Sequence, residues 1–331
     1  MAAKRKPKEE TNEFLAALKF VSRAQSESGT PNQTHCRIGW FNYVVAYDGI
    51  LAMGYPVKDN VPETCPHTLQ LVAAIERAKD VSALTFETNS ITVKTNKFRA
   101  TVPCLSSVDL HYVTVDQGQY AISKEFVAAA QIAAIFTKEG AQTVAGASVL
   151  TRNGSLVGTN GLALIEAWHG IATPPGLIIP KTFFDVIAKI DLPMQSFGYS
   201  ENTFTLWYEN GAWVKTQLYS EQWPNVDQLF AYTETAKPEE LDKDFWTALK
   251  SVSPFSEDHR VYFMNEFLCS HVSPGKGAEY KLKGLPSGQA YNAKILQTLE
   301  GIMKTADWTG NEKVSCFFGD NVRGVLSKMQ I

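Results

Sequence analysis

The residues that could carry out catalysis or bind a metal are scattered through this chain. Its five cysteines are odd in number and never spaced as CxxC, so neither a disulfide framework nor a structural zinc site is encoded. The chain contains no phosphate-binding glycine loop, no GxSxG nucleophile turn and no HExxH zinc motif. Six histidines lie far from one another in the sequence: His35, His67, His111, His169, His259 and His271. We therefore expect no catalytic residue, no metal and no cofactor.

Basic side chains are the ones that recur in a pattern. Lys19 and Arg23 are four residues apart, and Lys124, Gln131 and Lys138 recur every seven residues. Such stripes are typical either of a solvated helix face or of a surface that contacts nucleic-acid phosphates, and the pattern alone leaves both readings open. The candidate residues for phosphate contact are Lys19, Arg23, Arg77, Lys79, Lys124, Gln131, Lys138, Lys181, Lys189, Lys243, Lys250, Lys294 and Lys304.

Six segments of helical periodicity carry these side chains. Their apolar residues fall at helical spacing, as Phe14, Leu15, Leu18 and Val21 do in the first segment. Between the helices lie alternating runs typical of β-strands, and Asp-Gly or Asn-Gly pairs mark the hairpin turns. The expected helices are residues 12–25, 67–79, 122–139, 180–190, 241–253 and 291–305, and two of the expected strands are 90–95 and 203–208.

The composition is that of a folded protein larger than one small domain. The 331 residues are 44% hydrophobic and 20% charged, which excludes a disordered chain. The net charge of −3 argues against a protein that coats nucleic acid by bulk charge, but the predicted helices carry more basic than acidic side chains. No apolar run is long enough for a membrane span, and the charged N-terminus lacks the apolar core of a secretory signal. We therefore expect a soluble, cytoplasmic protein.

The spacing of the six helices suggests an internal repeat. The run Tyr47-Asp48-Gly49-Ile50-Leu51-Ala52 is similar to Thr159-Asn160-Gly161-Leu162-Ala163-Leu164, and each follows a predicted helix and hairpin. Six helix-plus-strands units pair into three α+β domains: a charged flexible tail at 1–10, then 11–115, 116–233 and 234–331. The tail is either solvated or a further phosphate contact. The alternative to the repeat is an α+β protein whose helices are spaced by chance.

Four stretches resemble the bacterial-type sliding clamp, the β subunit of the replicative DNA polymerase. They are the first helix with its Val-Ser-Arg-Ala run at 21–24, the strand pair at 157–164, the Ile-Ile-Pro-Lys helix start at 178–181, and the last eight residues, 324–331. Their order and spacing cover nearly the whole chain after the tail. The resemblance is to a bacteriophage or divergent bacterial form.

The resemblance implies a DNA clamp fold and a non-catalytic function. Three repeated domains per chain, each with two helices, would form a head-to-tail homodimer whose helices line a ring around duplex DNA, with antiparallel sheets outside. The basic residues named above would then contact phosphates without reading sequence. The ring would act as a processivity factor for DNA polymerase and would also bind the clamp loader and other replication and repair proteins.

The resemblance also implies an apolar pocket for short peptide motifs of these partners. Carried over position by position, its wall comprises Val144, Thr159, Gly161, Leu162, Leu164, Val325, Ser327 and Met329. Leu162-Ala163 stand where the family has His-Arg, and Ser327-Lys328 stand where it has Met-Pro, so the partner motif stays unassigned. For ring closure we expect pairing of edge strands at 98–105 and 261–268.

Two other functions remain open at this point. One is a clamp-like protein that sequesters or mimics host replication factors without encircling DNA, which the departures at Leu162 and Ser327 keep in play. The other is a nucleic-acid enzyme with an unrecognised site, which would show clustered titratable groups in a pocket.

Overall fold

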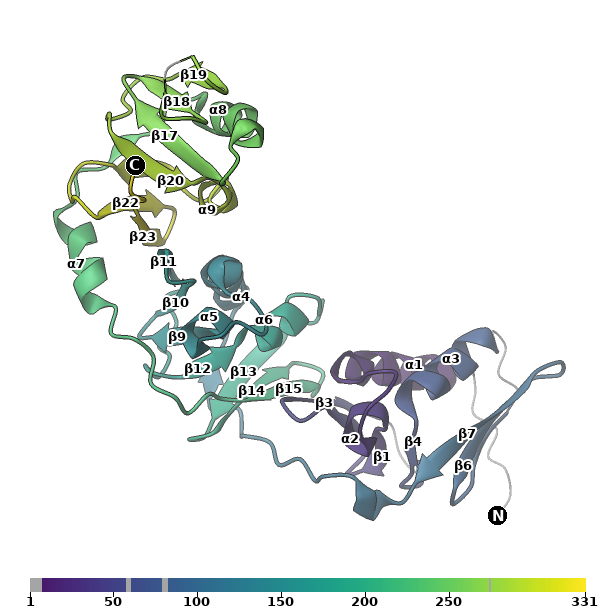
Figure 1. Cartoon of the computed structure of the whole chain (residues 1–331). Coiled ribbons are helices and arrows are strands. Elements are labelled where there is room, and N and C mark those ends of the chain that lie inside the picture. The colour runs from purple at the N-terminus through teal and green to yellow at the C-terminus, as the bar shows by residue number, and fades with distance from the viewer. Residues whose placement is uncertain (1–7, 58–60, 79–82, 274) are drawn as a thin grey trace. The chain divides into compact units, whose positions relative to one another are not determined.

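The computed structural model describes residues 8–57, 61–78, 83–273 and 275–331 (Figure 1). The chain forms two compact units. Unit 1 comprises residues 1–123 and 185–218, and unit 2 comprises residues 124–184 and 219–331. Helix α6 (Lys181–Ile187) spans the division between the two units.

Unit 1 is built on two antiparallel sheets. The larger has the order β1-β2-β3-β15-β14-β13-β8 and the smaller the order β4-β7-β6-β5. Helices α1 and α3 pack side by side, and α1 also lies against β2 and β3 (Figure 1). Its elements are α1 (Lys8–Val21), η1 (Ser22–Ala24), α2 (Pro31–Thr34), β1 (Arg37–Trp40), β2 (Tyr43–Tyr47), β3 (Leu51–Pro56), β4 (Cys65–Pro66), α3 (Thr68–Arg77), β5 (Ala83–Phe86), β6 (Ser90–Lys94), β7 (Arg99–Leu105), η2 (Ser107–Asp109), β8 (Tyr120–Ala121), β13 (Met194–Tyr199), β14 (Thr203–Tyr208) and β15 (Trp213–Gln217).

Unit 2 repeats this plan. Its larger sheet has the order β12-β9-β10-β11-β23-β22-β21-β16, its smaller one the order β19-β18-β17-β20, and helices α8 and α9 pack together. Its elements are α4 (Lys124–Ala133), η3 (Ala134–Phe136), α5 (Val144–Ala147), β9 (Ser148–Arg152), β10 (Ser155–Thr159), β11 (Ala163–Trp168), β12 (Ile178–Pro180), α7 (Asp227–Thr235), β16 (Glu239–Glu240), α8 (Phe245–Val252), η4 (Ser253–Phe255), β17 (Arg260–Met264), β18 (Phe267–Cys269), β19 (Glu279–Lys281), β20 (Gln289–Asn292), α9 (Ala293–Thr298), β21 (Thr305–Asp307), β22 (Val314–Gly319) and β23 (Val322–Ser327).

The mixed α+β fold class predicted from the sequence is confirmed, and each predicted helix is present, although most are shorter than expected. Helix α4 ends at Ala133 and continues only as the 3₁₀ turn η3, whereas the periodicity extended to residue 139. Helix α1 instead begins earlier than expected, at Lys8, inside the segment predicted as a tail. The predicted strands 90–95 and 203–208 are β6 and β14.

Antiparallel pairing joins segments that are distant in the sequence. In unit 1, β3 pairs with β15, with Ala52 opposite Lys215. In unit 2, β11 pairs with β23, with Leu164 opposite Val325. The two compact units cut through the predicted middle domain between residues 184 and 185, and the division into three domains stays a prediction.

One of the two segments predicted as edge strands is not at an edge. Strand β17 lies between β18 and β20, and β18 lies between β17 and β19, so the run 261–268 has both of its sides occupied. The outer strand of this sheet on that side is β19. Strand β7 is covered on one side by β6 along its length, while β4 pairs only with Cys104 and Leu105 at its end. Among the described residues, the edge at 99–102 is therefore unpaired.

A glycine sets the distance between α4 and its sheet. A Cβ atom built on Gly158 of β10 would come within 1.8 Å of the carbonyl oxygen of Ala133, the last residue of α4. Backbone atoms cannot retreat from such a contact as a flexible side chain can, so this close approach requires glycine.

Candidate functional site

Most of the basic residues predicted to contact phosphates lie on helices and are exposed. Arg77 on α3, Lys124 on α4, Lys250 on α8 and Lys294 on α9 all lie on the surface. Gln131 is exposed two turns after Lys124 on the same face of α4, and Lys181 begins α6 and is half-buried. The structure thus places these five cations on the helices that the sequence assigned to them.

Four other predicted residues lie outside the helices. Lys138 follows η3, Lys189 follows α6, Lys243 precedes α8 and Lys304 follows α9, although all four are exposed. The seven-residue stripe from Lys124 therefore does not continue on one helix to Lys138. The helices stop earlier than the pattern because their last turns tighten into 3₁₀ geometry or loops. Lys79 lies outside the described residues.

Several of these cations already have partners within the chain. Lys19 pairs with Glu76 of α3 at 2.6 Å, and Lys250 pairs with Glu300 at 2.6 Å. Lys304 pairs with Asp320. These pairs are exposed, so each is weak and exchanges readily for another anion.

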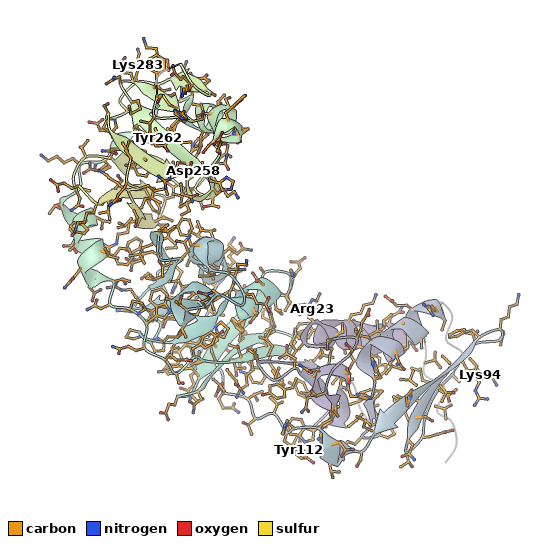
Figure 2. The ribbon with its side chains drawn as sticks, in the orientation of Figure 1. Arg23, Lys94, Tyr112, Asp258, Tyr262 and Lys283 are labelled. Atoms are coloured by element: carbon orange, nitrogen blue, oxygen red, sulfur yellow. The ribbon has the colours of Figure 1, made fainter. Side chains whose placement is uncertain are left out.

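Arg23 has a structural role at the end of α1 (labelled in Figure 2). Its guanidinium donates to the carbonyl oxygens of Lys19 and Phe20 at 3.3 and 3.5 Å. These carbonyls belong to the last turn of the helix, where a cation also interacts favourably with the helix dipole.

The residues predicted for the peptide pocket fall into two groups. Val144, Leu164 and Val325 join one apolar cluster in unit 2, in which Leu164 and Val325 are buried. Thr159 and Gly161 form the neighbouring β10–β11 turn, where the Thr159 hydroxyl donates to the carbonyl of Ala163 at 2.7 Å and accepts from the Gly161 N–H at 3.1 Å.

Leu162, Ser327 and Met329 lie apart from this cluster. They line a small cavity of about 20 Å³ together with residues of β20 and α9, including Tyr291 and Ile295. Leu162 is half exposed at the edge of this cavity, with a relative exposure of 50%. Leu162 precedes β11 and Met329 follows β23, so these two residues lie outside the strands that carry Leu164 and Val325.

The sequence pattern missed three residues that pack against the first group of predicted pocket residues. Trp223, Val226 and Phe230 are buried in the same cluster as Leu164, and the indole N–H of Trp223 donates to the Ser148 hydroxyl at 3.0 Å. The last two lie at or on α7, a helix that was not predicted. The spacing of Val226, Phe230 and Thr233, all buried, was the available signal.

A buried ion pair holds α7 against the sheet. The Glu166 carboxylate of β11 accepts from Arg323 of β23 at 2.8 and 2.7 Å and from the Ser155 hydroxyl at 2.7 Å. The same guanidinium donates to the Thr233 hydroxyl at 3.1 Å and lies 4.7 Å from the ring centroid of Phe230. This arrangement fixes α7 over the cluster that contains the predicted pocket residues.

Lys328, at one of the positions where the sequence departs from the predicted resemblance, is half-buried in unit 2. Its ammonium donates to the carbonyl oxygens of Trp308 and Asn311 at 2.6 and 2.7 Å. Burial lowers the pKa of Lys328 below its ordinary value, and the Asp307 carboxylate opposes that shift. The side chain therefore fastens the last strand to a neighbouring loop.

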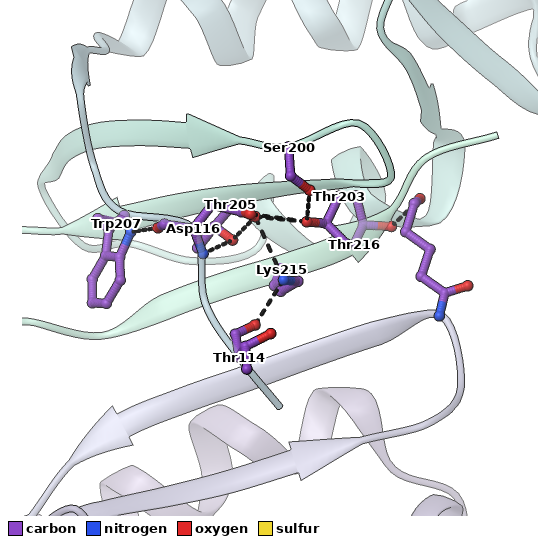
Figure 3. Close-up of polar contacts among 9 residues, drawn as sticks. Thr114, Asp116, Ser200, Thr203, Thr205, Trp207, Lys215 and Thr216 are labelled. Atoms are coloured by element: carbon purple, nitrogen blue, oxygen red, sulfur yellow. Dashed lines mark hydrogen bonds and ion pairs between the residues drawn. The ribbon is translucent and has the colours of Figure 1, made fainter. Parts of the chain in front are cut away.

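A polar cluster fastens the segment that follows η2 to the larger sheet of unit 1 (Figure 3). The Asp116 carboxylate accepts from the hydroxyls of Thr203 and Thr205, at 2.9 and 2.7 Å, and the indole N–H of Trp207 donates to the Asp116 carbonyl at 2.8 Å. The Lys215 ammonium donates to the carbonyl of Thr114 at 2.7 Å and lies 3.5 Å from the Asp116 carboxylate.

Groups suited to covalent or metal chemistry are not assembled in the part of the chain that the structure describes. No group of three or more His, Cys, Asp or Glu residues there could hold a metal ion. Burial raises the pKa of the Cys36 thiol to about 12, which removes the reactive thiolate at neutral pH. The rings of His35 and His67, distant in sequence, meet 5.2 Å apart, and burial followed by the charge of His67 lowers the pKa of His35. No helix among the described residues combines the length and apolar character needed to cross a bilayer.

Comparison with known proteins gives matches in structure only. No family model and no curated protein sequence matches the chain. The β sliding clamp of C. crescentus matches with a TM-score of 0.79 and 15% identity, over 97% of this chain and 98% of that one. The DNA polymerase III subunit β of Pseudomonas aeruginosa matches over the same shares with a TM-score of 0.78 and 13% identity. The Helicobacter pylori β clamp bound to a DNA ligase peptide also matches over the same shares, with a TM-score of 0.76 and 14% identity. The predicted resemblance is therefore confirmed at the level of structure, and the chain has the fold of the bacterial DNA polymerase III β sliding clamp.

Proposed function

We propose that this protein is a DNA sliding clamp, a non-catalytic processivity factor whose two copies close into a ring around duplex DNA. The observation that carries the proposal is the match to sliding clamps over 97% of the chain and 98% of theirs. The ring tethers a DNA polymerase and docks the clamp loader and other replication proteins through short peptide motifs. The Helicobacter pylori clamp with its bound DNA ligase peptide supports this mode of docking.

The DNA contacts of the proposed ring come from exposed cations on its helices. Lys124 and Lys294 have no ion pair within the described residues and are available for phosphates. Such contacts are independent of sequence and release counterions, so they weaken as salt rises. Because retention is topological, each contact can be weak while the ring stays on the DNA.

Ring closure is assigned to β7 of one copy and β19 of the other. Both strands have an unpaired side among the described residues, and pairing them would continue the two four-stranded sheets across the interface. The interface repeats twice in a head-to-tail dimer, which closes the ring. The expected segment 98–105 is kept in this proposal, and 261–268 is replaced by β19.

Retention on plasmid DNA tests the proposal. The protein is loaded onto a nicked circular plasmid by its cognate loader, or by passive opening at high concentration, and the plasmid is then cut once. A ring stays on the circle and slides off the linear ends. Equal retention on both forms would show that the protein binds without encircling, as in the alternative of a clamp-like protein that sequesters replication factors.

Charge reversal tests the DNA-facing helices in the same assay. Lys124→Glu should lower DNA association and reduce the salt dependence, by roughly one unit of the log–log slope for each phosphate that the variant no longer neutralises. Lys313→Glu is the matched control, because Lys313 is an exposed lysine that is not among the predicted phosphate contacts. An unchanged salt slope for Lys124→Glu removes α4 from the DNA path.

A further inference from the structure

The turn between β2 and β3 in unit 1 repeats the turn between β10 and β11 in unit 2. Asp48 Oδ1 accepts from the backbone N–H groups two and three residues further on, at 2.8 and 2.7 Å. Asn160 Oδ1 does the same at 3.0 and 2.8 Å. The apolar residue at the tip is half exposed in both turns, with a relative exposure of 51% for Ile50 and 50% for Leu162. The two hairpins are therefore equivalent in local structure.

The strands that flank the two turns are equivalent as well. Ala52 of β3 lies opposite Lys215 of β15, just as Leu164 of β11 lies opposite Val325 of β23. Leu164 and Val325 belong to the cluster that contains the predicted peptide-pocket residues. Unit 1 thus has, at the matching place, a second site of the same construction.

The site in unit 1 is open where the one in unit 2 is filled. A cavity of about 330 Å³ lies over β3 and β15, and its walls include Tyr47, Ile50, Ala52, Tyr112, Val113 and Lys215. Two differences between the units account for the open cavity in unit 1. Alanine stands where unit 2 has Leu164, and the covering segment contributes Val113, whereas unit 2 buries Trp223, Val226 and Phe230 at its cluster. A volume of this size is within the range of ligand sites and accommodates large apolar side chains.

The charge of the lining favours an acidic occupant. Lys215 contributes the one ammonium to the walls, and no Asp or Glu is among the residues that line the cavity. Only one hydrogen bond of this ammonium is found among the described residues, to the carbonyl of Thr114, and the Asp116 carboxylate is 3.5 Å away (Figure 3). With one donor used by Thr114 and one directed at Asp116, a third N–H donor is left for a carbonyl or carboxylate of a bound molecule.

The rim of the cavity is aromatic, exposed and held in place. Tyr112, labelled in Figure 2, has a relative exposure of 63% and lies with its ring centroid 4.0 Å from the Arg37 guanidinium. Arg37 is buried and donates to the carbonyl of Leu110 at 2.9 Å, which fixes the segment that carries the tyrosine. Trp40 lies between Tyr112 and Phe41, with ring centroids 5.9 and 5.0 Å away. Phe41, which does not line the cavity, is 78% exposed with a φ of 48°, a conformation that is rare for a bulky side chain. An exposed, preorganised apolar surface of this kind is typical of a binding site.

We infer that this cavity is a second docking site for partner proteins, which takes a short peptide with bulky apolar side chains next to an acidic residue. The apolar side chains enter between Ile50, Ala52 and Tyr112, and the carboxylate accepts from Lys215. The inference rests on the proposed docking of partner peptides, because the unit 1 site copies the strands and turn of the unit 2 site. It adds that one chain can hold two partner segments at once.

The test uses the full-length protein and the blocked tripeptide acetyl-Phe-Asp-Leu-amide. The δ1 methyl groups of isoleucine are labelled, and the Ile50 signal is followed by NMR during the titration. We expect a saturable shift of Ile50. Acetyl-Ser-Asp-Ser-amide should cause no shift, and acetyl-Phe-Lys-Leu-amide should bind at least tenfold more weakly. An equal shift with the serine peptide, or no shift with the first peptide at millimolar concentration, would overturn the inference.

Two matched variants separate this site from the one in unit 2. Because Ile50→Glu removes the methyl probe, binding to the variants is measured by fluorescence anisotropy of the labelled peptide. Ile50→Glu should weaken this binding at least tenfold, while Leu162→Glu at the equivalent turn should leave it within twofold. Both side chains are half exposed, so folding should tolerate either change, and Ile50→Gln serves as a milder substitute. Loss with Leu162→Glu alone would place the peptide only in unit 2 and refute the second site.

Two further outcomes keep the inference distinct from its alternatives. If the Ile50 signal shifts with protein concentration in the absence of peptide, a second copy of the chain occupies the cavity and the peptide assignment is wrong. Failure of retention on circular DNA would refute the proposed clamp function, whereas the Ile50 shift is measured without DNA. The two results therefore fail independently.

Discussion

The ion pairs of this protein differ sharply in how deeply they are buried. The Glu166 carboxylate is 3% exposed and is compensated by Arg323, by the Ser155 hydroxyl and more distantly by Arg152 at 3.6 Å. The pair of Lys304 and Asp320, by contrast, lies in solvent. Removing one partner of a buried pair leaves an uncompensated charge, whereas removing a surface partner changes little.

We predict that Arg323→Met lowers the free energy of unfolding by about 3 kcal/mol, because Glu166 loses its main partner and α7 loses its anchor at Thr233. Lys304→Met is the control and should change it by less than about 1 kcal/mol. Urea denaturation monitored by circular dichroism measures both. A difference smaller than about 1 kcal/mol between the two variants would show that the buried pair does not hold α7.

At the level of single residues, the sequence identified cations well and their neighbours poorly. Charge and spacing in the sequence placed Lys124 and Lys294 on exposed helix surfaces. The same pattern did not show that Arg23 bonds to the end of its own helix or that Lys328 turns inward to two carbonyls. Those interactions depend on which backbone groups lie within reach, and periodicity carries no information about that.

Among the elements, helices with an apolar face were the most predictable. Their existence follows from apolar spacing, but their ends depend on the last turn, which is why Lys138 fell outside α4. The peptide-pocket residues were divided because Leu162 and Met329 lie outside the strands β11 and β23, and α7 was missed because only Phe230 and Thr233 of its residues are buried. Pairing partners such as β11 and β23 lie too far apart in the sequence for local patterns to reveal.

The close approach of α4 to β10 leads to a prediction about packing. Gly158→Ala should destabilise the protein by about 3 kcal/mol, since the new methyl group would overlap the Ala133 carbonyl and push α4 off the sheet. Gly140→Ala is the control: it has a φ of +70° but open space around it, so it should cost only about 1 kcal/mol of backbone strain. Thermal unfolding compares the two, and equal midpoints would contradict the packing argument.

For the whole molecule, the proposed ring depends on the free side of β7. The carbonyl of Pro103 accepts from His67 on the β4 side, and alternation along the strand turns the N–H of Thr101 toward that same side. On the other side of β7, Thr101 lies opposite Thr92 of β6, and the backbone hydrogen bonds to β6 are made by the residues next to Thr101. A proline at position 101 would therefore remove a donor from the free edge and leave the sheet of unit 1 paired.

We predict that Thr101→Pro weakens the dimer by about 1–2 kcal/mol, which is roughly tenfold in the dissociation constant. Sedimentation velocity across a concentration series measures the shift. Lys281→Pro on β19 should act in the same direction, because the N–H of its neighbour Leu282 donates to the Glu266 carbonyl on the β18 side, which leaves the Lys281 N–H on the free side. A dimer unaffected by both variants would exclude these two edges from the interface, and a lost circular dichroism signal would trace the effect to unfolding instead.

The long-range strand pairs also constrain how the chain folds during synthesis. Strand β11 acquires its second neighbour only when β23 has been made, and β3 must wait for β15. Until then each hairpin has an unpaired strand edge whose backbone N–H and C=O groups are open to other nascent chains. Folding rates fall as contacts become more distant in sequence, so closure of these two sheets is expected to be the slow step. During synthesis, the hairpins are therefore expected to form early, and the two larger sheets to be completed only after their last strands have been made.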